Sequence, residues 1–160
     1  MKSAELLERT ARSDELVEGE EKSKYALNVV GVYQDTRTHS WAAPMCHLVT
    51  QLAKDELVQN RWFHVGSLTD AGIFHDAVHA ALEADVIVIT LYAAEELPLN
   101  LYVWIDAWLP RRRSRLGALT ALIGVTEPPN AQPAHTLDYL RDVARRAQLD
   151  FIPQPRVFSL

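Results

Sequence analysis

The chain has 160 residues, of which 48% are hydrophobic and 23% charged, and its formal net charge is -5. This composition is that of a globular domain and excludes a disordered chain. The acidic balance argues against a dedicated nucleic-acid-binding protein. The single cysteine, Cys46, excludes an intrachain disulfide and a zinc site built from several cysteines.

The first 24 residues differ in character from the rest of the chain. They hold seven acidic and five basic residues and few large apolar ones. We therefore expect a mobile, charged leader over residues 1–24, followed by a single domain over residues 25–160. The leader lacks the apolar core of a signal peptide, and no apolar run approaches the ~20 residues of a membrane span. Together with the lone cysteine, these features predict a cytoplasmic protein with no membrane partner.

Five stretches have the composition of β-strands. The run Asp85–Tyr92 is the most continuously apolar, which is typical of a central strand in a parallel sheet. A short strand at Asp150–Ile152 is expected to precede a tail interrupted by prolines. The other three predicted strands are Ala26–Tyr33, Arg61–Leu68 and Ala118–Thr126.

Four helical stretches alternate with these strands. Apolar residues at spacings of three and four predict an inward face in each helix. In the second helix, Thr69 or Asp70 is the predicted cap, and Phe74, Val78, Ala81 and Leu82 point inward. The predicted helices are His39–Glu56, the segment that follows this cap, Pro98–Leu109 and Ala134–Gln148.

The alternation of strands and helices predicts an α/β fold, a three-layer doubly wound parallel sheet of four to five strands. The flavodoxin-like strand order 2-1-3-4-5 is the favoured topology, and half of a Rossmann fold, with order 3-2-1-4, is the alternative. Val29–Val32 and Val86–Ile89 are expected to be adjacent at the centre, because they belong to the two most continuously apolar strands.

In such a sheet, ligands bind at the carboxyl ends of the strands, where the strand order reverses. The loop after the first strand is rich in hydroxyl and basic side chains next to a helix start, which favours an anion such as phosphate. Its candidate ligand-binding residues are Thr36, Arg37, Thr38 and Ser40. Tyr92 and Glu95, after the third strand, form the expected facing wall. The same residue types also cap helices without any ligand, so both interpretations stay open at this point.

The strand-loop-helix at Val29–Trp41 resembles flavodoxin-like proteins, and its polar and basic loop is loosely similar to that of NADPH-dependent FMN reductases. The resemblance implies FMN as a cofactor, with Trp41 and Tyr92 flanking its isoalloxazine ring. Asp35–Ser40 departs from the phosphate loop of flavodoxins, because it contains no glycine. The stretch Asp85–Leu109 is most similar to uncharacterised bacterial proteins of this length, a likeness that implies no activity.

His75 and His79 are four residues apart, so they share one face of the predicted second helix, which Glu83 continues. Two imidazoles and a carboxylate are zinc-ligand types. This face is opposite to the apolar one, so we interpret it as solvent-exposed and predict no metal site. Cys46 is interpreted as a small core residue.

Two further clusters bear on partners. The run Arg111–Arg115 follows a helix end, where its charges suit the helix dipole and can pair with acidic groups of this chain or of a partner. Tyr102, Trp104 and Trp108 on the preceding helix exceed what one helix face can bury. They predict an exposed aromatic patch and a homo-oligomer.

These observations leave two main functional hypotheses, beside a third, a metal site at His75, His79 and Glu83. The first is a binding or protein-interaction module that associates with itself. The second is an FMN- or nucleotide-dependent reductase with an anion site at Thr36–Trp41 and Tyr92–Glu95. The sequence contains no nucleophile elbow, Walker loop or glycine-rich dinucleotide motif that would decide between them.

Overall fold

The computed structural model describes residues 27–53, 57–113, 116–126 and 132–158. The leader expected over residues 1–24 lies outside these ranges. In the described part of the chain, no helix is long and apolar enough to cross a membrane.

Five parallel strands form one sheet in the order β2-β1-β3-β4-β5, which confirms the predicted order 2-1-3-4-5 and excludes the alternative 3-2-1-4. Residues Val29–Tyr33 of β1 pair with Val86–Thr90 of β3, so the two most apolar strands are adjacent at the centre as predicted. The strands are β1 (Leu27–Tyr33), β2 (Val58–His64), β3 (Val86–Tyr92), β4 (Ala118–Thr126) and β5 (Asp150–Phe158).

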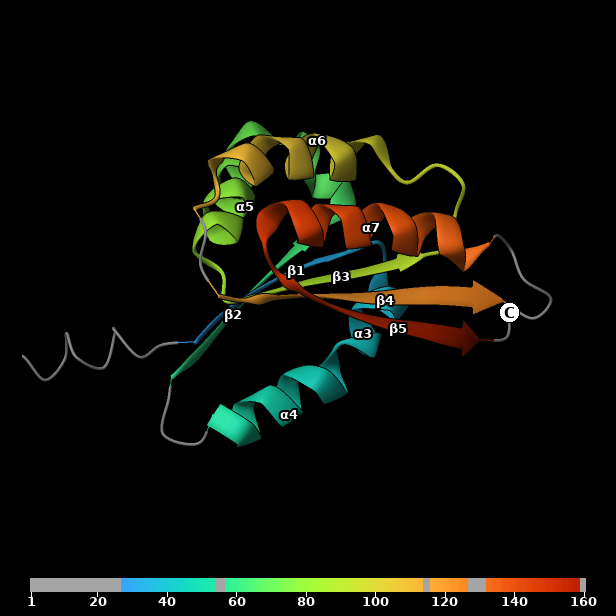
Figure 1. The fold of residues 1–160 in the computed structure, drawn as a ribbon, viewed down its shortest axis with the longest axis horizontal. Coiled ribbons are helices and arrows are strands. Elements are labelled where there is room, and N and C mark those ends of the chain that lie inside the picture. Colours follow the sequence, from blue (N-terminus) through green and yellow to red (C-terminus); the bar gives the residue numbers. More distant parts are fainter. Residues whose placement is uncertain (1–26, 54–56, 114–115, 127–131, 159–160) are drawn as a thin grey trace, which may run out of the picture.

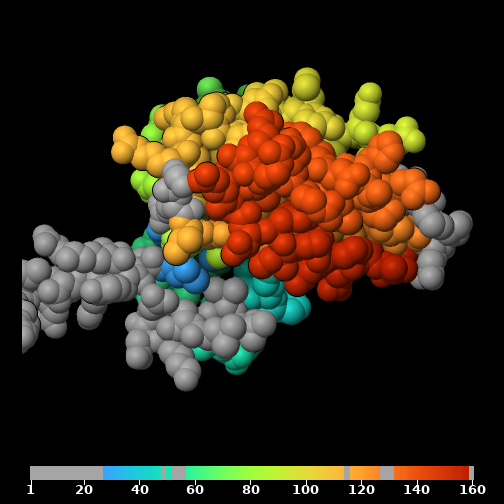
Figure 2. Space-filling view, in the orientation of Figure 1, coloured from blue at the N-terminus to red at the C-terminus, as the bar shows by residue number. Residues whose placement is uncertain are grey.

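Helices cover both faces of the sheet (Figure 1). We call first face the one that lies under α5 (Ala71–Glu83), α6 (Leu99–Trp108) and α7 (Pro133–Ala147). The second face carries α3 (Thr36–Trp41) and α4 (Ala43–Ala53). Short 3-10 helices follow β2, as η1 (Val65–Thr69), and α6, as η2 (Leu109–Arg111). In the space-filling view, α7 and β5 form much of one side of the molecule (Figure 2).

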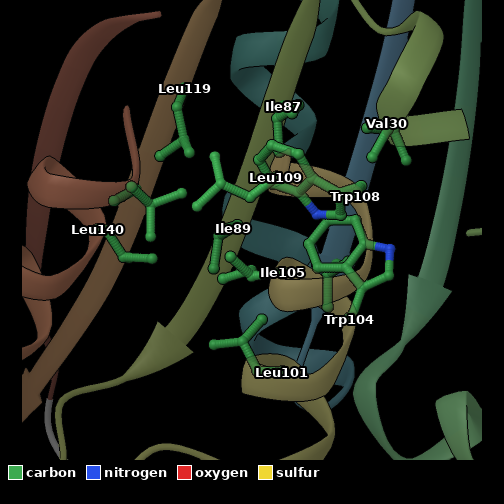
Figure 3. Packing of buried hydrophobic residues seen from close by; sticks show 14 of the residues in the cluster. Val30, Ile87, Ile89, Leu101, Trp104, Ile105, Trp108, Leu109, Leu119 and Leu140 are labelled. Atoms are coloured by element: carbon green, nitrogen blue, oxygen red, sulfur yellow. The ribbon is translucent and has the colours of Figure 1, made fainter. Parts of the chain in front are cut away.

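The first face holds the larger core, to which α6 contributes two tryptophans together with Leu101 and Ile105 (Figure 3). Trp104 and Trp108 are fully buried there, with ring centroids 5.7 Å apart. The prediction of an exposed aromatic patch is therefore wrong. The two tryptophans are four residues apart and share the inward face with Leu101 and Ile105, while Tyr102 lies half-buried against Tyr139 at 5.0 Å.

On the second face, two tryptophan rings lie directly on glycines of the sheet. A Cβ atom at Gly31 would come within 2.0 Å of the Trp62 ring, and one at Gly124 within 2.3 Å of the Trp41 ring. Because any larger residue would collide with these rings, both glycines create the space that the tryptophans fill.

Two element boundaries differ from the prediction at the first crossover. Asp35 caps a helix that begins at Thr36 rather than His39, and Pro44 divides the predicted helix into α3 and α4. Proline lacks the N–H that would continue the hydrogen-bond ladder, so a new helix starts around it. The second strand ends at His64, and the predicted strand residues Val65–Leu68 form η1 instead. Asp70 caps α5 as expected, since its carboxylate accepts the Ile73 N–H at 3.0 Å.

β5 is a nine-residue edge strand, whereas the sequence suggested a three-residue strand and a broken tail. Pro153 and Pro155 are two residues apart, so their nitrogens point to the same side of the strand. An edge strand has one side without a neighbouring strand, where a missing N–H costs no ladder bond. The prolines are therefore compatible with a long strand at this place.

The predicted basic run is not a single surface patch. Arg112 is buried, and its guanidinium donates to the carbonyl of Ala81 at 2.7 Å, near the end of α5. Arg111 and Arg113 are exposed, and residues 114–115 lie outside the described ranges. Cys46 is half-buried rather than a core residue.

Candidate functional site

The strand order reverses between β1 and β3, and Gln34 links the strand ends at this point. Its side-chain oxygen accepts the Tyr92 N–H at the end of β3 at 3.0 Å. Its backbone carbonyl lies 2.9 Å from Nε2 of His64 at the end of β2. One residue thus ties three neighbouring strands together. The sequence analysis assigned no role to Gln34 or His64.

Asp35 and Thr38 form a closed capping arrangement at the start of α3. The Asp35 carboxylate accepts the Thr38 N–H at 2.9 Å and the Tyr92 hydroxyl at 2.7 Å. The Thr38 hydroxyl accepts the N–H groups of Gln34 and Asp35, each at 2.9 Å, and donates to the Asp35 carbonyl. This is a capping box in which both polar side chains are fully used.

The structure places the four predicted anion ligands in different environments. Thr38 is fully buried, and Ser40 donates its hydroxyl to the Arg37 carbonyl at 2.6 Å. Thr36 and Arg37 are exposed. Because α3 has only six residues and its start is capped by a carboxylate, its backbone offers little to an anion. Of the four residues, Arg37 keeps a charged donor facing outward.

Trp41, Tyr92 and Phe158 meet at the carboxyl edge of the sheet, and we call them the aromatic edge cluster. Their ring centroids are 5.3 to 5.7 Å apart. Two guanidinium groups lie on this cluster, Arg37 at 5.0 Å from the Phe158 ring and Arg156 at 5.9 Å from the Trp41 ring. The cluster therefore combines aromatic surface with two positive charges.

The sequence analysis missed Phe158 of this cluster and Arg156, which lies against it. Both belong to the part of β5 that was interpreted as a tail broken by prolines. Side chains alternate between the two faces of a strand, so Ile152, Gln154, Arg156 and Phe158 share one face of β5. In a parallel sheet this alternation brings Arg156 and Phe158 to the same edge as Tyr92.

The hydrogen bond between Asp35 and Tyr92 changes the acidity of both groups. Partial burial alone would raise the pKa of Asp35, but hydrogen bonds from the Thr38 N–H, the Tyr92 hydroxyl and other donors lower it overall. The pKa of Tyr92 is raised by burial, by this hydrogen bond and by the negative charge of Asp35, and only Arg37 opposes the shift. At neutral pH the pair is a carboxylate that holds a neutral phenol.

Glu95 is exposed on the loop after β3. Among the described residues, no hydrogen bond or ion pair joins it to Arg37 or Asp35. Tyr92 thus joins the edge that was predicted for it, and Glu95 lies apart from that edge's hydrogen-bond network.

Beside this edge, a second group of rings surrounds Tyr33. Its ring stacks on His39 at 4.2 Å and lies 5.5 Å from His64, and His39 is 5.1 Å from Trp62. An open hollow of about 290 Å³ borders this group and reaches Cys46. Burial raises the pKa of the Cys46 thiol, so the group is a neutral thiol at neutral pH.

His75 and His79 lie on the exposed side of α5 with ring centroids 4.4 Å apart. Within the described ranges, no three His, Cys, Asp or Glu side chains come together in a way that could hold a metal ion. The two imidazoles are therefore a pair without a third ligand from these residues.

The fold is flavodoxin-like, and solved structures share it. No protein-family model matches the chain, and no relative was found among curated proteins. The chain matches a flavodiiron core from Synechocystis with 16% identity and a TM-score of 0.59, over 88% of this chain and 32% of that chain. It thus spans about a third of that protein's length.

Two other structures are similar over most of their own length. NADH:FMN oxidoreductase in its apo form has 20% identity and a TM-score of 0.53, with 84% of this chain and 75% of that one covered. General stress protein 14 of Treponema denticola, solved in complex with FMN, has 14% identity and a TM-score of 0.51, with 82% and 86% covered. At such identities the likeness establishes the fold alone.

Proposed function

We propose that the chain binds FMN at the carboxyl edge of its sheet and works as the flavin-binding domain of an oxidoreductase. The observation that carries this proposal is the aromatic edge cluster with the guanidinium groups of Arg37 and Arg156 against it. FMN joins a flat aromatic ring system to a phosphate, and the cluster joins aromatic rings to two cations. The FMN-related proteins with the same fold support the same choice of cofactor.

The residues at this edge have distinct tasks in the proposed complex. Arg37 and Arg156 hold the phosphate through charge-assisted hydrogen bonds. Tyr92 and Phe158, which are half-buried, present ring surface to the isoalloxazine. Bound FMN supplies hydride and electron transfer. Asp35 fixes the Tyr92 hydroxyl, and buried Trp41 supports Tyr92 and Phe158 from the second face of the sheet.

Asp35 also determines where the phosphate can lie. Its carboxylate is ionised at neutral pH and occupies the start of α3, so it repels a phosphate at that place. We therefore place the phosphate beside the two guanidinium groups and away from the helix start. In this respect the proposal departs from the backbone site that the loop sequence suggested.

The test is a titration of the full chain with FMN, followed by quenching of flavin fluorescence. Replacing Arg37 or Arg156 by Ala should weaken binding by about 10- to 150-fold, the range for a hydrogen bond to a charged group. Arg141→Ala, on the exposed side of α7, is the matched control and should change nothing. Riboflavin, which lacks the phosphate, should bind wild type and both variants equally weakly. Absence of FMN binding at millimolar concentration refutes the proposal.

The second candidate function is a self-associating interaction module. It is favoured by Leu99 and Val103, which are four residues apart on α6 and 73% and 47% exposed. Such a stripe of apolar surface is typical of a helix that packs against another chain. If this function holds, sedimentation should show a dimer that Val103→Glu dissociates, whereas Val157→Glu, at an exposed position on β5, should leave it intact.

A further inference from the structure

A groove between α5 and α6 lies outside the site described above. It has a volume of about 370 Å³ and is open to solvent along one side. Phe74 and Val78 of α5 and Ala107 of α6 form its apolar floor. His75, His79 and Arg111 line it as well, and all three are exposed.

The lining chemistry defines what fits the groove. Arg111 is a permanent cation, and the two imidazoles are hydrogen-bonding groups that become cationic on protonation. Glu83 continues the face of His75 and His79 one turn beyond His79 and does not line the groove. Asp76 on α5 and Asp106 on α6 each follow or precede a lining residue by one position. They therefore point about 100° away from it around the helix axis. An occupant with apolar side chains for the floor and carboxylates for the rim is complementary to this surface.

The chain itself contains such a segment. Residues 14–21, with the sequence DELVEGEE, hold five acidic residues and no basic one. Leu16 and Val17 lie between these carboxylates and supply two apolar side chains. The flanking stretches 1–13 and 22–24 contain all five basic residues of the first 24, so the acidic character is confined to this segment.

The segment is also close enough to reach the groove. Asn28, at the start of β1, accepts the Asp85 N–H at 2.8 Å, and its side-chain amide lies 3.5 Å from the carbonyl of Glu83 at the end of α5. His79 and His75 are four and eight residues further up that helix, about 6 and 12 Å along its axis. The five residues 22–26 span up to about 17 Å when extended. Residues 14–21 therefore fall within reach of the groove.

We propose that residues 14–21 dock into the groove between α5 and α6 of the same chain, with Leu16 and Val17 on Phe74 and Val78 and the carboxylates beside Arg111, His75 and His79. In the docked state, the acidic segment covers the apolar floor of the groove between α5 and α6. The proposal is independent of FMN, because the groove and the aromatic edge cluster share no residue.

The experiment uses the full chain with a nitroxide label at Ser13→Cys in a Cys46→Ser background, and it measures paramagnetic loss of amide NMR signals. Docking places the label beside α5, so signals of His75 and His79 should weaken strongly. Signals of Arg141 and Arg145 on α7 should persist. The double variant Arg111→Glu, His79→Glu should restore the α5 signals. Adding Glu15→Lys and Glu18→Lys to that variant should weaken them again, because the charges are then exchanged.

Three outcomes overturn the proposal. The first is a signal loss that is equal on α5 and α7. The second is a signal loss on α5 that is as strong in the double variant Arg111→Glu, His79→Glu as in the matched control Arg141→Glu. Charge at the groove would then have no part in the loss. The third is found by mixing labelled chain with isotope-enriched, unlabelled chain. If the α5 signals of the unlabelled chain weaken as much, the segment docks onto a second copy and not onto its own chain.

Discussion

On the first face of the sheet, three helices press aliphatic side chains and two tryptophans into one large core, whereas on the second face the rings of Trp41 from α3 and Trp62 from β2 rest on glycines. On the first face, the α6 residues Trp104 and Trp108 are fully buried. The second face ends at the carboxyl edge in partly exposed rings and charged groups. Most of the stability therefore depends on the first face and the candidate site on the second, so mutations can change one without the other.

The largest expected effect is on the first face. Trp104→Ala should lower the free energy of unfolding by about 3–5 kcal/mol, because it leaves a large cavity beside β1 and β3. Val103→Ala, one position away and exposed, is the matched control and should cost little. Urea denaturation measures both. FMN affinity at native conditions should be unchanged in Trp104→Ala; a parallel loss of binding would show that the two faces are not separable.

On the second face, Gly124→Ala should lower the free energy of unfolding by about 1–3 kcal/mol, the cost of overpacking. The added Cβ would lie 2.3 Å from the Trp41 ring and displace it from the aromatic edge cluster. FMN binding should weaken as well, since Trp41 supports Tyr92 and Phe158. In Gly72→Ala, the new Cβ meets the Asp70 carboxylate at 3.4 Å, an ordinary contact, so this control should be neutral or slightly stabilising.

At the carboxyl edge itself, Asp35→Ala should lower the free energy of unfolding by about 0.5–2 kcal/mol through loss of the α3 cap. Asp35→Asn keeps a capping oxygen and should cost less. Because the Asn variant also removes the negative charge near the proposed phosphate position, it should bind FMN more tightly than wild type. Weaker binding by this variant would contradict the proposed repulsion.

The same variant gives a pH test whose sign follows from the lowered pKa of Asp35. In the folded chain, the pKa of the Asp35 carboxyl lies below its ordinary value of 3.8, so the ionised group stabilises the fold at neutral pH. That contribution is lost as the pH falls from 3.8 through the folded pKa. The stability of Asp35→Asn should therefore fall less steeply in this acid range than that of wild type, as followed by thermal unfolding.

The central strands were predictable because their composition leaves one interpretation. Ala118–Thr126 is a strand with the predicted bounds, and Val86–Tyr92 differs from its prediction by one residue. The length of β5 was not predicted, since Pro153 and Pro155 break most strands and are tolerated only at an edge. Whether a strand is at an edge depends on the assembled sheet and not on its own residues.

The sequence indicated some of the side chains that meet at the carboxyl edge, and whether they bind a ligand stays a prediction. Arg37, Trp41 and Tyr92 were identified from the loop after β1 and the end of β3, and they do meet at one edge. Thr38 and Ser40 have the residue type of anion ligands, yet their hydroxyls bond to the backbone of their own turn. Capping and ligand binding use the same side chains, so only the geometry distinguishes them.

The smallest expected effect compares one tyrosine from each face. On the first face, the pKa of Tyr139 is raised to about 12 by burial, then by the charge of Asp106 and by Tyr102, against the opposing charge of Arg146. The ordinary pKa is 10.0, so neutral Tyr139 stabilises the fold below pH 10, and this contribution is lost as the pH rises towards 12. The pKa of Tyr92, on the second face, is raised by burial and then by its hydrogen bond to Asp35. Ultraviolet titration of phenolate formation distinguishes the two causes. Asp106→Asn should lower the pKa of Tyr139 and leave Tyr92 unchanged, and Asp35→Asn should do the reverse. If either substitution moves both tyrosines, the two faces share an electrostatic coupling that their separate packing does not predict.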